Sequence, residues 1–283
     1  MRYLLFNPLS GHGNAEDVAK TYALTLAEPS LLVDMTKDDV ASIVQGMARE
    51  DSIVLFGGDG TLNCFVNMLD TDALVGTVYY LPTGTGNDFF TDLKAPVESE
   101  PVEITKYLRA LPVVKYNDEE KRFINGVGYG IDGYCCEVGD AMKAQGKIPN
   151  YAGIAIKGLL FHYKPCGATV VVDGVSHRYE RVWIAPTMLG GYYGGGMKPA
   201  PGQNRENGRL SLMVFHGSGK LRTLMIFPSI FSGKHVKHKK YVDVLLGEEI
   251  TVTFDESRPM QIDGETVVGQ TAYHAVAKHT IEI

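Results

Sequence analysis

The stretch SIVLFGGDGT, residues 52–61, decides the fold. Ser52 opens a continuous apolar run, which is typical of a parallel strand that is buried on both faces. The run leads into a glycine-rich turn, and apolar residues then recur at helical spacing, at Leu62, Phe65, Val66 and Leu69. This order of strand, glycine turn and helix predicts a β-α-β unit of a parallel sheet.

The same order repeats on both sides of this stretch. A strand is expected at 2–7, a helix at 15–27 and a second strand at 31–35. A helix start is expected at 36–39, and a further strand at 77–81 ends in another glycine-rich loop. The first part of the chain is therefore predicted to be a Rossmann-like α/β domain, with its loops at the carboxyl ends of parallel strands.

The hydrophobic pattern changes near residue 115. Two hairpins are expected, one over 113–125 and one over 169–185 that turns at Asp173-Gly174, with a helical insertion around 151–161. Further short strands follow at 210–215, 242–246, 250–254, 260–262 and 273–277. The second part is therefore predicted to be mainly antiparallel β structure of sandwich-like form.

The length of the chain also favours two domains. It has 283 residues, and single hydrophobic cores stop growing at about 250 residues. We predict an α/β nucleotide-binding domain over 1–115 and a β-rich substrate domain over 116–283. The last strand is a candidate to return to the first domain.

The composition limits the partners and the location. Lys and Arg number 27 and Asp and Glu 33, so the formal charge of −6 argues against a nucleic-acid binder. The four cysteines have neither the density nor the spacing of a disulfide framework or a zinc site, which fits a reducing cytoplasm. Residues 1–11 lack the features of a signal peptide, and no membrane-spanning helix is expected. We expect a cytoplasmic protein that touches a membrane only at its surface.

The turn Gly57-Gly58-Asp59-Gly60-Thr61 has the chemistry of a phosphate site. Its glycines let backbone N–H groups approach a polyphosphate, and the helix N-terminus adds partial positive charge. Asp59 then places a carboxylate among phosphates, which predicts Mg²⁺ held through water. The alternative is a plain tight turn, which leaves Asp59 without a role.

Two further loops are expected at the same sheet edge. They are Asn7-Pro8-Leu9-Ser10-Gly11-His12-Gly13 and Thr83-Gly84-Thr85-Gly86-Asn87-Asp88. The first alone is a weak signal, because Asn-Pro and Gly-x-Gly are as common in plain turns. Three glycine loops together predict a nucleotide with several phosphates.

These motifs resemble those of the lipid kinases with a diacylglycerol kinase catalytic domain, relatives of the sphingosine kinases and, more distantly, of the NAD kinases. The resemblance runs nearly from end to end of the chain. It implies ATP and Mg²⁺ as cofactors, with the nucleotide between the two domains. The nucleotide residues that it implies are Asn7, Pro8, Ser10, Gly11, Thr36, Gly57, Gly58, Asp59, Gly60, Thr61, Asn63, Thr85, Asn87 and Asp88.

The second part carries further signatures of the family. They are Asn125-x-x-Gly128-x-Gly130-x-Asp132, Gly194-Gly195-Gly196-Met197-Lys198, Gly233-Lys234-His235-x-x-His238 and Asp263-Gly264-Glu265. The resemblance implies Glu265 as the general base, Asp132 beside it, and Asp59 with Asp88 on the nucleotide and its Mg²⁺. Without the family, Asp263-Gly264 is a hairpin turn and Glu265 a solvated strand residue.

The chain departs from the family pattern at three places. Gly11-His12-Gly13-Asn14 lacks the lysine that members often have, for which His12, Arg2 or a lysine of the second domain could substitute. Cys64 stands where the family commonly has Glu. Asn207 stands where many bacterial relatives have an Asp of a structural Mg²⁺ site, and since a hard cation prefers anionic oxygen we predict no structural metal there.

The segment 233–240 concentrates four lysines in an acidic protein. It predicts transient docking on an anionic membrane surface, and a solvated loop is the open alternative. A metal site at His235 and His238 is not predicted, because no cysteine or carboxylate flanks them. The family resemblance also suggests a homodimer.

The resulting hypothesis is an ATP-dependent lipid kinase that transfers the γ-phosphoryl group to a lipid hydroxyl, most simply that of a diacylglycerol-like lipid. Two alternatives stay open: an NAD kinase-like enzyme that acts on a soluble nucleotide, and a catalytically silent nucleotide-binding regulator. The sequence does not indicate which lipid accepts the phosphoryl group.

Overall fold

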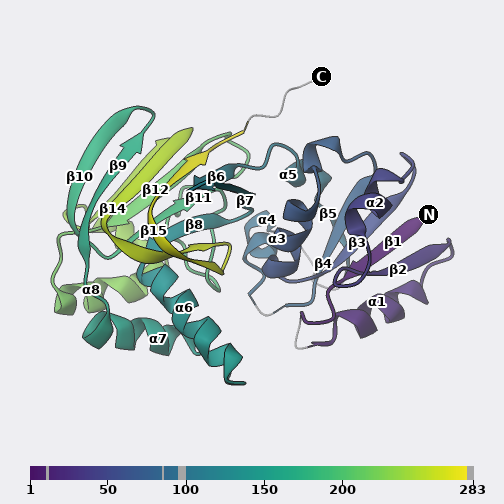
Figure 1. Cartoon of the computed structure of the whole chain (residues 1–283), viewed down its shortest axis with the longest axis horizontal. Helices are drawn as coiled ribbons and strands as arrows, with labels where there is room; N and C mark the ends of the chain where they lie inside the picture. The colour runs from purple at the N-terminus through teal and green to yellow at the C-terminus, as the bar shows by residue number, and fades with distance from the viewer. Residues whose placement is uncertain (11–12, 85, 95–99, 279–283) are drawn as a thin grey trace. The chain divides into compact units, whose positions relative to one another are not determined.

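The computed structural model describes residues 1–10, 13–84, 86–94 and 100–278, and these form two compact units. The first unit is Met1–Leu111, and the second begins at Pro112 (Figure 1). The last described strand belongs to the second unit. The last predicted strand, 273–277, was the candidate to return to the first domain, but it pairs with β14 (Glu249–Ile262) and β6 (Val113–Tyr116) in the second unit. Residues 279–283 lie outside the described residues.

The described part of the first unit has one five-stranded sheet, in the order β2-β1-β3-β4-β5. Its first four strands are parallel and β5 is antiparallel to β4. The strands are β1 (Arg2–Phe6), β2 (Ser30–Asp34), β3 (Ser52–Gly57), β4 (Thr77–Pro82) and β5 (Val102–Glu103). The helices are α1 (Ala15–Ala23), α2 (Val40–Gln45), α3 (Asp59–Met68), α4 (Asp88–Leu93) and α5 (Thr105–Leu108).

The central strand β3 is buried along its whole length, as its apolar run predicts. Val54 and Phe56 face a core that β1 and α1 complete with Leu4, Ala15 and Ala19. A parallel sheet needs cover on both faces, and the alternating helices supply it. The predicted Rossmann-like architecture of the first domain is confirmed.

The second unit contains a single ten-stranded antiparallel sheet among its described residues. Its main order is β13-β12-β11-β8-β14-β15-β6-β7, and the pair β9 and β10 joins at β14. The strands are β6 (Val113–Tyr116), β7 (Glu119–Arg122), β8 (Gly126–Gly130), β9 (Cys166–Val172), β10 (Val175–Val182), β11 (Ile184–Met188), β12 (Leu210–Phe215), β13 (Val242–Gly247), β14 (Glu249–Ile262) and β15 (Glu265–Val276).

The long strand β14 makes this sheet fold over itself. Its first half pairs with β9 through Ile250–Phe254, and its last residues Met260–Ile262 pair with β8. The ring of Tyr129 stacks on Phe254 and on Tyr273 in the core so enclosed, with ring centroids 4.5 and 6.0 Å apart. The predicted sandwich-like, mainly antiparallel character is confirmed.

Two helices of the second unit are absent from the sequence prediction. They are α6 (Ile131–Ala144) and α8 (Lys220–Ile226), and they join the expected helix α7 (Tyr151–Lys157). Glycines interrupt the helical pattern of α6, yet Gly133 is required there because a Cβ would collide with the Pro259 carbonyl oxygen of β14. The expected strands 250–254 and 260–262 are one strand, since bulged pairing with β15 continues through the polar residues between them.

The three helices α6, α7 and α8 lie on one side of the antiparallel sheet in Figure 1. A second core beneath them contains Leu159, Trp183, Ile226 and Phe227. None of the described helices is long and apolar enough to cross a membrane.

Candidate functional site

Two glycine-rich turns of the first unit lie against each other. Strands β3 and β4 are parallel neighbours, so the turns that follow them leave the same sheet edge. Gly58 and Gly84 approach so closely that a Cβ on Gly84 would lie 2.9 Å from the Gly58 Cα. The structure therefore brings the predicted segments 57–61 and 83–88 together.

The helix α3 begins inside the segment 57–61, which was predicted to be a glycine loop. Gly58 is its N-cap and Asp59 its first residue, so Gly60, Thr61 and Asn63 are already helical. Thr61 and Asn63 are buried, and the Thr61 side chain fills the space that a Cβ on Gly57 would need. Gly60 faces open space. The turn offers a ligand the helix N-terminus at Gly58–Gly60, while Thr61 packs inside.

The carboxylate of Asp59 caps a neighbouring helix. Its Oδ2 accepts the backbone N–H of Asp88 at 2.8 Å, and its Oδ1 accepts that of Phe89 at 3.0 Å. These N–H groups belong to the first turn of α4, where an acceptor and a negative charge are both stabilising. The premise that a plain turn would leave Asp59 without a role is therefore wrong, because Asp59 holds the two turns together.

Asn87 has a buried acceptor at the contact of the two turns. It has a left-handed backbone (φ 43°), and its Nδ2 donates to the Gly84 carbonyl at 2.7 Å. Its Oδ1 has no hydrogen-bond partner among the described residues. Asp88 beside it is buried, and Thr85 lies outside the described residues.

The first predicted loop is held by its own polar groups. Asn7 Oδ1 accepts the N–H of Leu9 at 2.9 Å, and the Ser10 hydroxyl donates to the Asn7 carbonyl at 2.8 Å. Pro8 lies in this turn, at the carboxyl end of β1 and hence at the same edge as the other two turns. Gly11 and His12 lie outside the described residues.

Thr36 lies in a turn before α2 and not at its start. Its N–H and hydroxyl both donate to Asp34 Oδ1, at 2.9 and 2.6 Å. Lys37, and then Thr36, lower the pKa of Asp34 to about 2. The helix begins at Val40, because Asp39 is the residue whose carboxylate accepts the Ser42 N–H. The helix start predicted over 36–39 is therefore met at its last residue, Asp39, and Thr36 lies in the turn before it.

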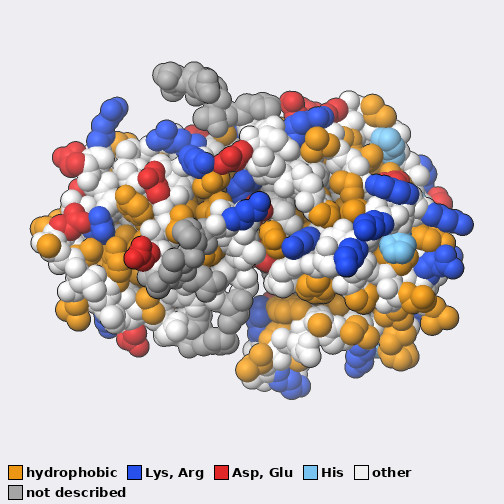
Figure 2. Space-filling view, turned by 180° about the vertical axis from the view of Figure 1, so that it is seen from behind, with side chains coloured by type: hydrophobic (Ala, Val, Ile, Leu, Met, Phe, Trp, Pro, Cys, Tyr) orange, Lys and Arg blue, Asp and Glu red, His pale blue; other side chains and the backbone are white. Residues whose placement is uncertain are grey.

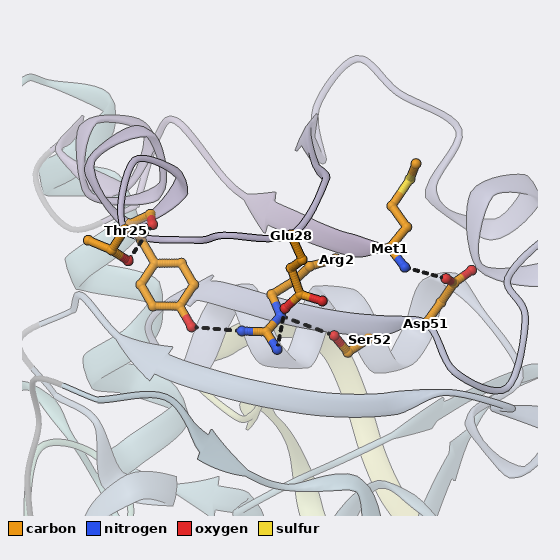
Figure 3. A network of polar contacts seen from close by, with 7 residues as sticks. Met1, Arg2, Thr25, Glu28, Asp51 and Ser52 are labelled. Carbon is orange, nitrogen blue, oxygen red and sulfur yellow. Dashed lines mark hydrogen bonds and ion pairs between the residues drawn. The ribbon is translucent and has the colours of Figure 1, made fainter.

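Arg2 does not substitute for the missing lysine of the first loop. Figure 3 shows it among the polar groups at the amino end of β1, which is the edge opposite the glycine turns. Its guanidinium pairs with Glu28 at 2.7 Å and donates to the Ser52 and Tyr22 hydroxyls, both at 3.2 Å. The suggestion of Arg2 as a phosphate cation is wrong, because the strand directs it away from that edge.

Asp132 of the second unit is a buried acid at the start of α6. Its side chain occupies the space beside Gly128, where any Cβ would collide with its carboxylate. Oδ2 accepts a long hydrogen bond from the Tyr193 hydroxyl at 3.4 Å, and Oδ1 lacks a hydrogen-bond partner among the described residues. Burial, the largest cause, raises the pKa of Asp132 to about 6. A buried carboxylate with an unsatisfied oxygen is an unusual feature that a ligand hydroxyl could satisfy.

Gln261 connects Asp132 to the predicted Asp263-Gly264-Glu265 turn. A Cβ on Gly128 would lie 2.8 Å from the Gln261 Nε2 and would also meet Asp132, so both side chains adjoin Gly128. Gln261 Oε1 accepts the N–H of Gly264 at 2.7 Å. The structure thus places two of the predicted motifs next to each other.

Asp263 anchors that turn to a distant strand. Its two carboxylate oxygens accept the backbone N–H groups of Ile124, Asn125 and Gly126, at 2.6, 2.9 and 2.9 Å. Asp263 and Gly264 both have positive φ angles, 47° and 90°, as expected for a tight hairpin turn. The family motif at 125–132 and the turn at 263–265 therefore form one structure.

Glu265 lies at the surface of the described second unit. Its side chain is 48% exposed and forms an ion pair with Lys121 of β7 at 3.1 Å. Sequence reasoning missed Lys121, Tyr193 as a partner of Asp132, and the anchoring role of Asp263. No local signal could reveal them, since each depends on pairing between distant segments.

The remaining signatures of the second unit support the fold. His235 is buried, and its Nε2 lies 2.8 Å from the Pro199 carbonyl oxygen. In the 200–209 loop, Gln203 Nε2 donates to the Leu189 and Arg209 carbonyls at 2.9 and 2.8 Å, and Asn207 Oδ1 accepts the Arg209 N–H. The described residues include no group of three or more His, Cys, Asp or Glu side chains that could hold a metal ion.

Comparison with known proteins places the chain in a family. Residues 2–115 match the model of the diacylglycerol kinase catalytic domain, and residues 125–283 match the YegS C-terminal NAD kinase beta sandwich-like domain. The chain belongs to the diacylglycerol kinase catalytic domain family, as its motifs predicted.

The relatives agree with this membership. The chain is 26% identical over 255 residues to the diacylglycerol kinase of Mycobacterium tuberculosis, with 82% of this chain and 79% of that one covered. It is 23% identical over 302 residues to YtlR of Bacillus subtilis, provisionally named a lipid kinase, with 96% and 94% covered. A Bacillus anthracis crystal structure, provisionally named a diacylglycerol kinase, has a TM-score of 0.69 at 20% identity, covering 97% and 91%. The last likeness concerns the fold alone.

Proposed function

We propose that the protein is an ATP-dependent lipid kinase that transfers the γ-phosphoryl group to the hydroxyl of a diacylglycerol-like lipid. Its family and the names of its relatives support a kinase of this kind. The structural observation that carries the proposal is Asp132, a buried acid with one unsatisfied oxygen beside the turn that bears Glu265. Such a pair suits an acceptor hydroxyl.

The nucleotide is assigned to the paired turns of the first unit. The N-terminus of α3 at Gly58–Gly60 favours phosphate oxygens, because its N–H groups and helix dipole both attract anions. The Oδ1 of Asn87 is a buried acceptor that a donor group of the nucleotide could satisfy. These features support ATP binding at this edge of the sheet.

The described residues could hold Mg²⁺ only together with the phosphates of a bound nucleotide. Both oxygens of Asp59 accept backbone N–H groups, and no cluster that could cage a metal occurs in the described part of the chain. Mg²⁺ commonly keeps several waters and uses one or two carboxylates with substrate phosphates, and Asp59 can supply such an outer contact. When bound, the ion offsets phosphate charge.

Glu265 and Asp132 are assigned to the acceptor. Asp132 Oδ1 would hold the lipid hydroxyl by a hydrogen bond, and Glu265 would accept its proton as the hydroxyl oxygen bonds to the γ-phosphorus. The bond from that phosphorus to the bridging oxygen breaks, and ADP leaves with the electron pair. Glu265 must exchange its Lys121 partner for the hydroxyl in this step.

The test substitutes Glu265→Gln and compares it with Glu120→Gln. Glu120 is also about half exposed and also pairs with a lysine, Lys115, at 3.2 Å, so the two variants lose equivalent ion pairs. Because a general base contributes about 10²–10⁴-fold, we expect turnover of diacylglycerol to fall by that factor only in Glu265→Gln, with ATP affinity kept. Equal turnover in both variants would remove Glu265 from the reaction.

A second candidate is transfer to a soluble dinucleotide. The likeness of the C-terminal family model to an NAD kinase domain favours it. It predicts that NAD is phosphorylated in the absence of lipid. A silent regulator, in contrast, would bind ATP and phosphorylate neither acceptor.

A further inference from the structure

The helical side of the second unit exposes large apolar side chains. Phe161 is 71% exposed on the turn that follows α7, and Leu221 and Met225 are 78% and 82% exposed on α8. Ile156 of α7 is 52% exposed, and no residue of this short helix is buried. Leu221 and Met225 are four residues apart in a helix and therefore share a face. We call Ile156, Phe161, Leu221 and Met225 the α7–α8 face.

These residues come from two segments that are joined by a hydrogen bond. Lys220 Nζ donates to the Leu160 carbonyl at 3.0 Å, which ties the first residue of α8 to the turn that carries Phe161. Figure 1 shows α7 and α8 on the same side of the antiparallel sheet. Beneath the outer residues, Leu159 and Ile226 belong to one buried core, so the backbone that presents the face is fixed.

A mainly apolar cavity lies between α6 and α7. Its volume is about 270 Å³, and its lining includes Tyr134, Val138 and Met142 of α6 and Ile154 of α7. Asn150, Lys157 and His162 also line it. A mainly apolar cavity next to exposed apolar side chains enlarges the surface that a nonpolar phase could cover.

The two segments that carry this face contain basic residues and no acidic ones, although Asp140 of α6 pairs with Lys143 at 3.1 Å. Residues 141–172 and 207–242 contain no Asp or Glu in a chain whose formal charge is −6. The basic residues of these two segments are Lys143, Lys147, Lys157, Lys164, Arg209, Lys220, Arg222, Lys234, Lys237, Lys239 and Lys240. Hydrophobic and basic side chains gather without acidic ones at the lower right of Figure 2.

We propose that the α7–α8 face docks on the surface of an anionic lipid bilayer. Exposed Leu, Met and Phe side chains flanked by lysines, with no carboxylate in their own two segments, match an interface that is apolar within and negative at its headgroups. Each lysine near such a surface strengthens binding about fivefold, and each large apolar side chain about tenfold. The remaining acidic surface of the protein is repelled, so the charge pattern orients the second unit on the membrane.

Vesicle flotation of the full chain without ATP tests this inference. Wild-type protein should bind vesicles of phosphatidylcholine with phosphatidylglycerol more tightly than vesicles of phosphatidylcholine alone, and salt should weaken the difference. Leu221→Ser combined with Met225→Ser should weaken binding to both, by about a hundredfold. Lys157→Gln combined with Lys164→Gln should reduce only the preference for the anionic vesicles.

The control is Leu24→Ser, which changes an equally exposed leucine of the first unit (88% exposed) and should bind as wild type. Vesicle binding that Leu221→Ser and Met225→Ser leave unchanged would overturn the proposal. Loss of self-association in sedimentation velocity, with vesicle binding unchanged, would assign the face to a second copy of the chain. Turnover of lipid in detergent micelles is measured separately, so failure of docking and failure of the proposed kinase activity are distinguishable.

Discussion

The buried carboxylate of Asp132, which we assign to the acceptor hydroxyl, lowers the free energy of unfolding at neutral pH. Burial raises its pKa from 3.8 to about 6, so the folded protein favours the protonated acid. Well below pH 3.8 the acid is protonated in both the folded and unfolded states, and no penalty arises. The penalty grows between pH 4 and 6, and above pH 6 it reaches about 3 kcal/mol, since one pKa unit is about 1.4 kcal/mol.

Asp132→Asn should therefore stabilise the protein at pH 8 and have little effect at pH 4, because the amide carries no charge at either pH. Asp118→Asn, at an exposed turn, is the control and should show no such difference. The measurement is the free energy of unfolding in urea at both pH values, with turnover alongside, which should fall. The same stability change at pH 4 and pH 8 would mean that burial of charge is not what Asp132 contributes.

Single residues were predicted with uneven success. The glycine turn at 57–61 singled out Asp59, whereas Asp132 and Glu265 were indicated by the resemblance to the family. Their partners were not visible, since the cap that Asp59 provides to α4 and the ion pair of Glu265 with Lys121 join segments that are far apart. A motif indicates that a residue matters, whereas its contacts depend on the register of strands.

The two Asp-Gly hairpin turns differ in how they use their carboxylates. Asp263 uses both oxygens, for the N–H groups of Ile124, Asn125 and Gly126. Asp173 accepts the N–H groups of Glu248 and Glu249 with Oδ1 alone. An asparagine has only one acceptor oxygen, so it can replace Asp173 more easily than Asp263.

Asp263→Asn should lower the free energy of unfolding by about 1–3 kcal/mol, because at least one buried N–H loses its acceptor. Asp173→Asn keeps the oxygen that serves both donors and should have a smaller effect. Both asparagines tolerate the left-handed backbone of these turns, so strain does not differ between the variants. Urea denaturation of the pair measures the difference, and equal midpoints would refute the anchoring role of Asp263.

Helices and strands with a regular hydrophobic period were predictable from the sequence. Those whose period is interrupted by glycines or polar residues were not. The run that became β3 is wholly buried, and the period-two pattern of β9 and β10 gave their hairpin correctly. Helix α6 was missed because glycines break its pattern; their role is to let α6 approach β14, which only the packed structure reveals. Strand β14 was divided in two because its middle residues are polar and bulged.

At the scale of the whole molecule, the sequence predicted both fold classes, since each half has its own periodicity and its own kind of turn. The gathering of basic and apolar residues on the α7–α8 face was not predictable, because its residues come from two segments about sixty positions apart that meet only in the folded unit.

Transfer of labelled phosphate from ATP tests the central claim most directly. The full chain is incubated with γ-labelled ATP, Mg²⁺ and, separately, dispersed diacylglycerol, a panel of other lipid alcohols, and NAD. We predict label in a phosphorylated lipid that co-migrates with phosphatidic acid or a close analogue, and none in NADP. Label in NADP alone, or in no acceptor despite ATP binding, would contradict the assignment of the chain as a lipid kinase.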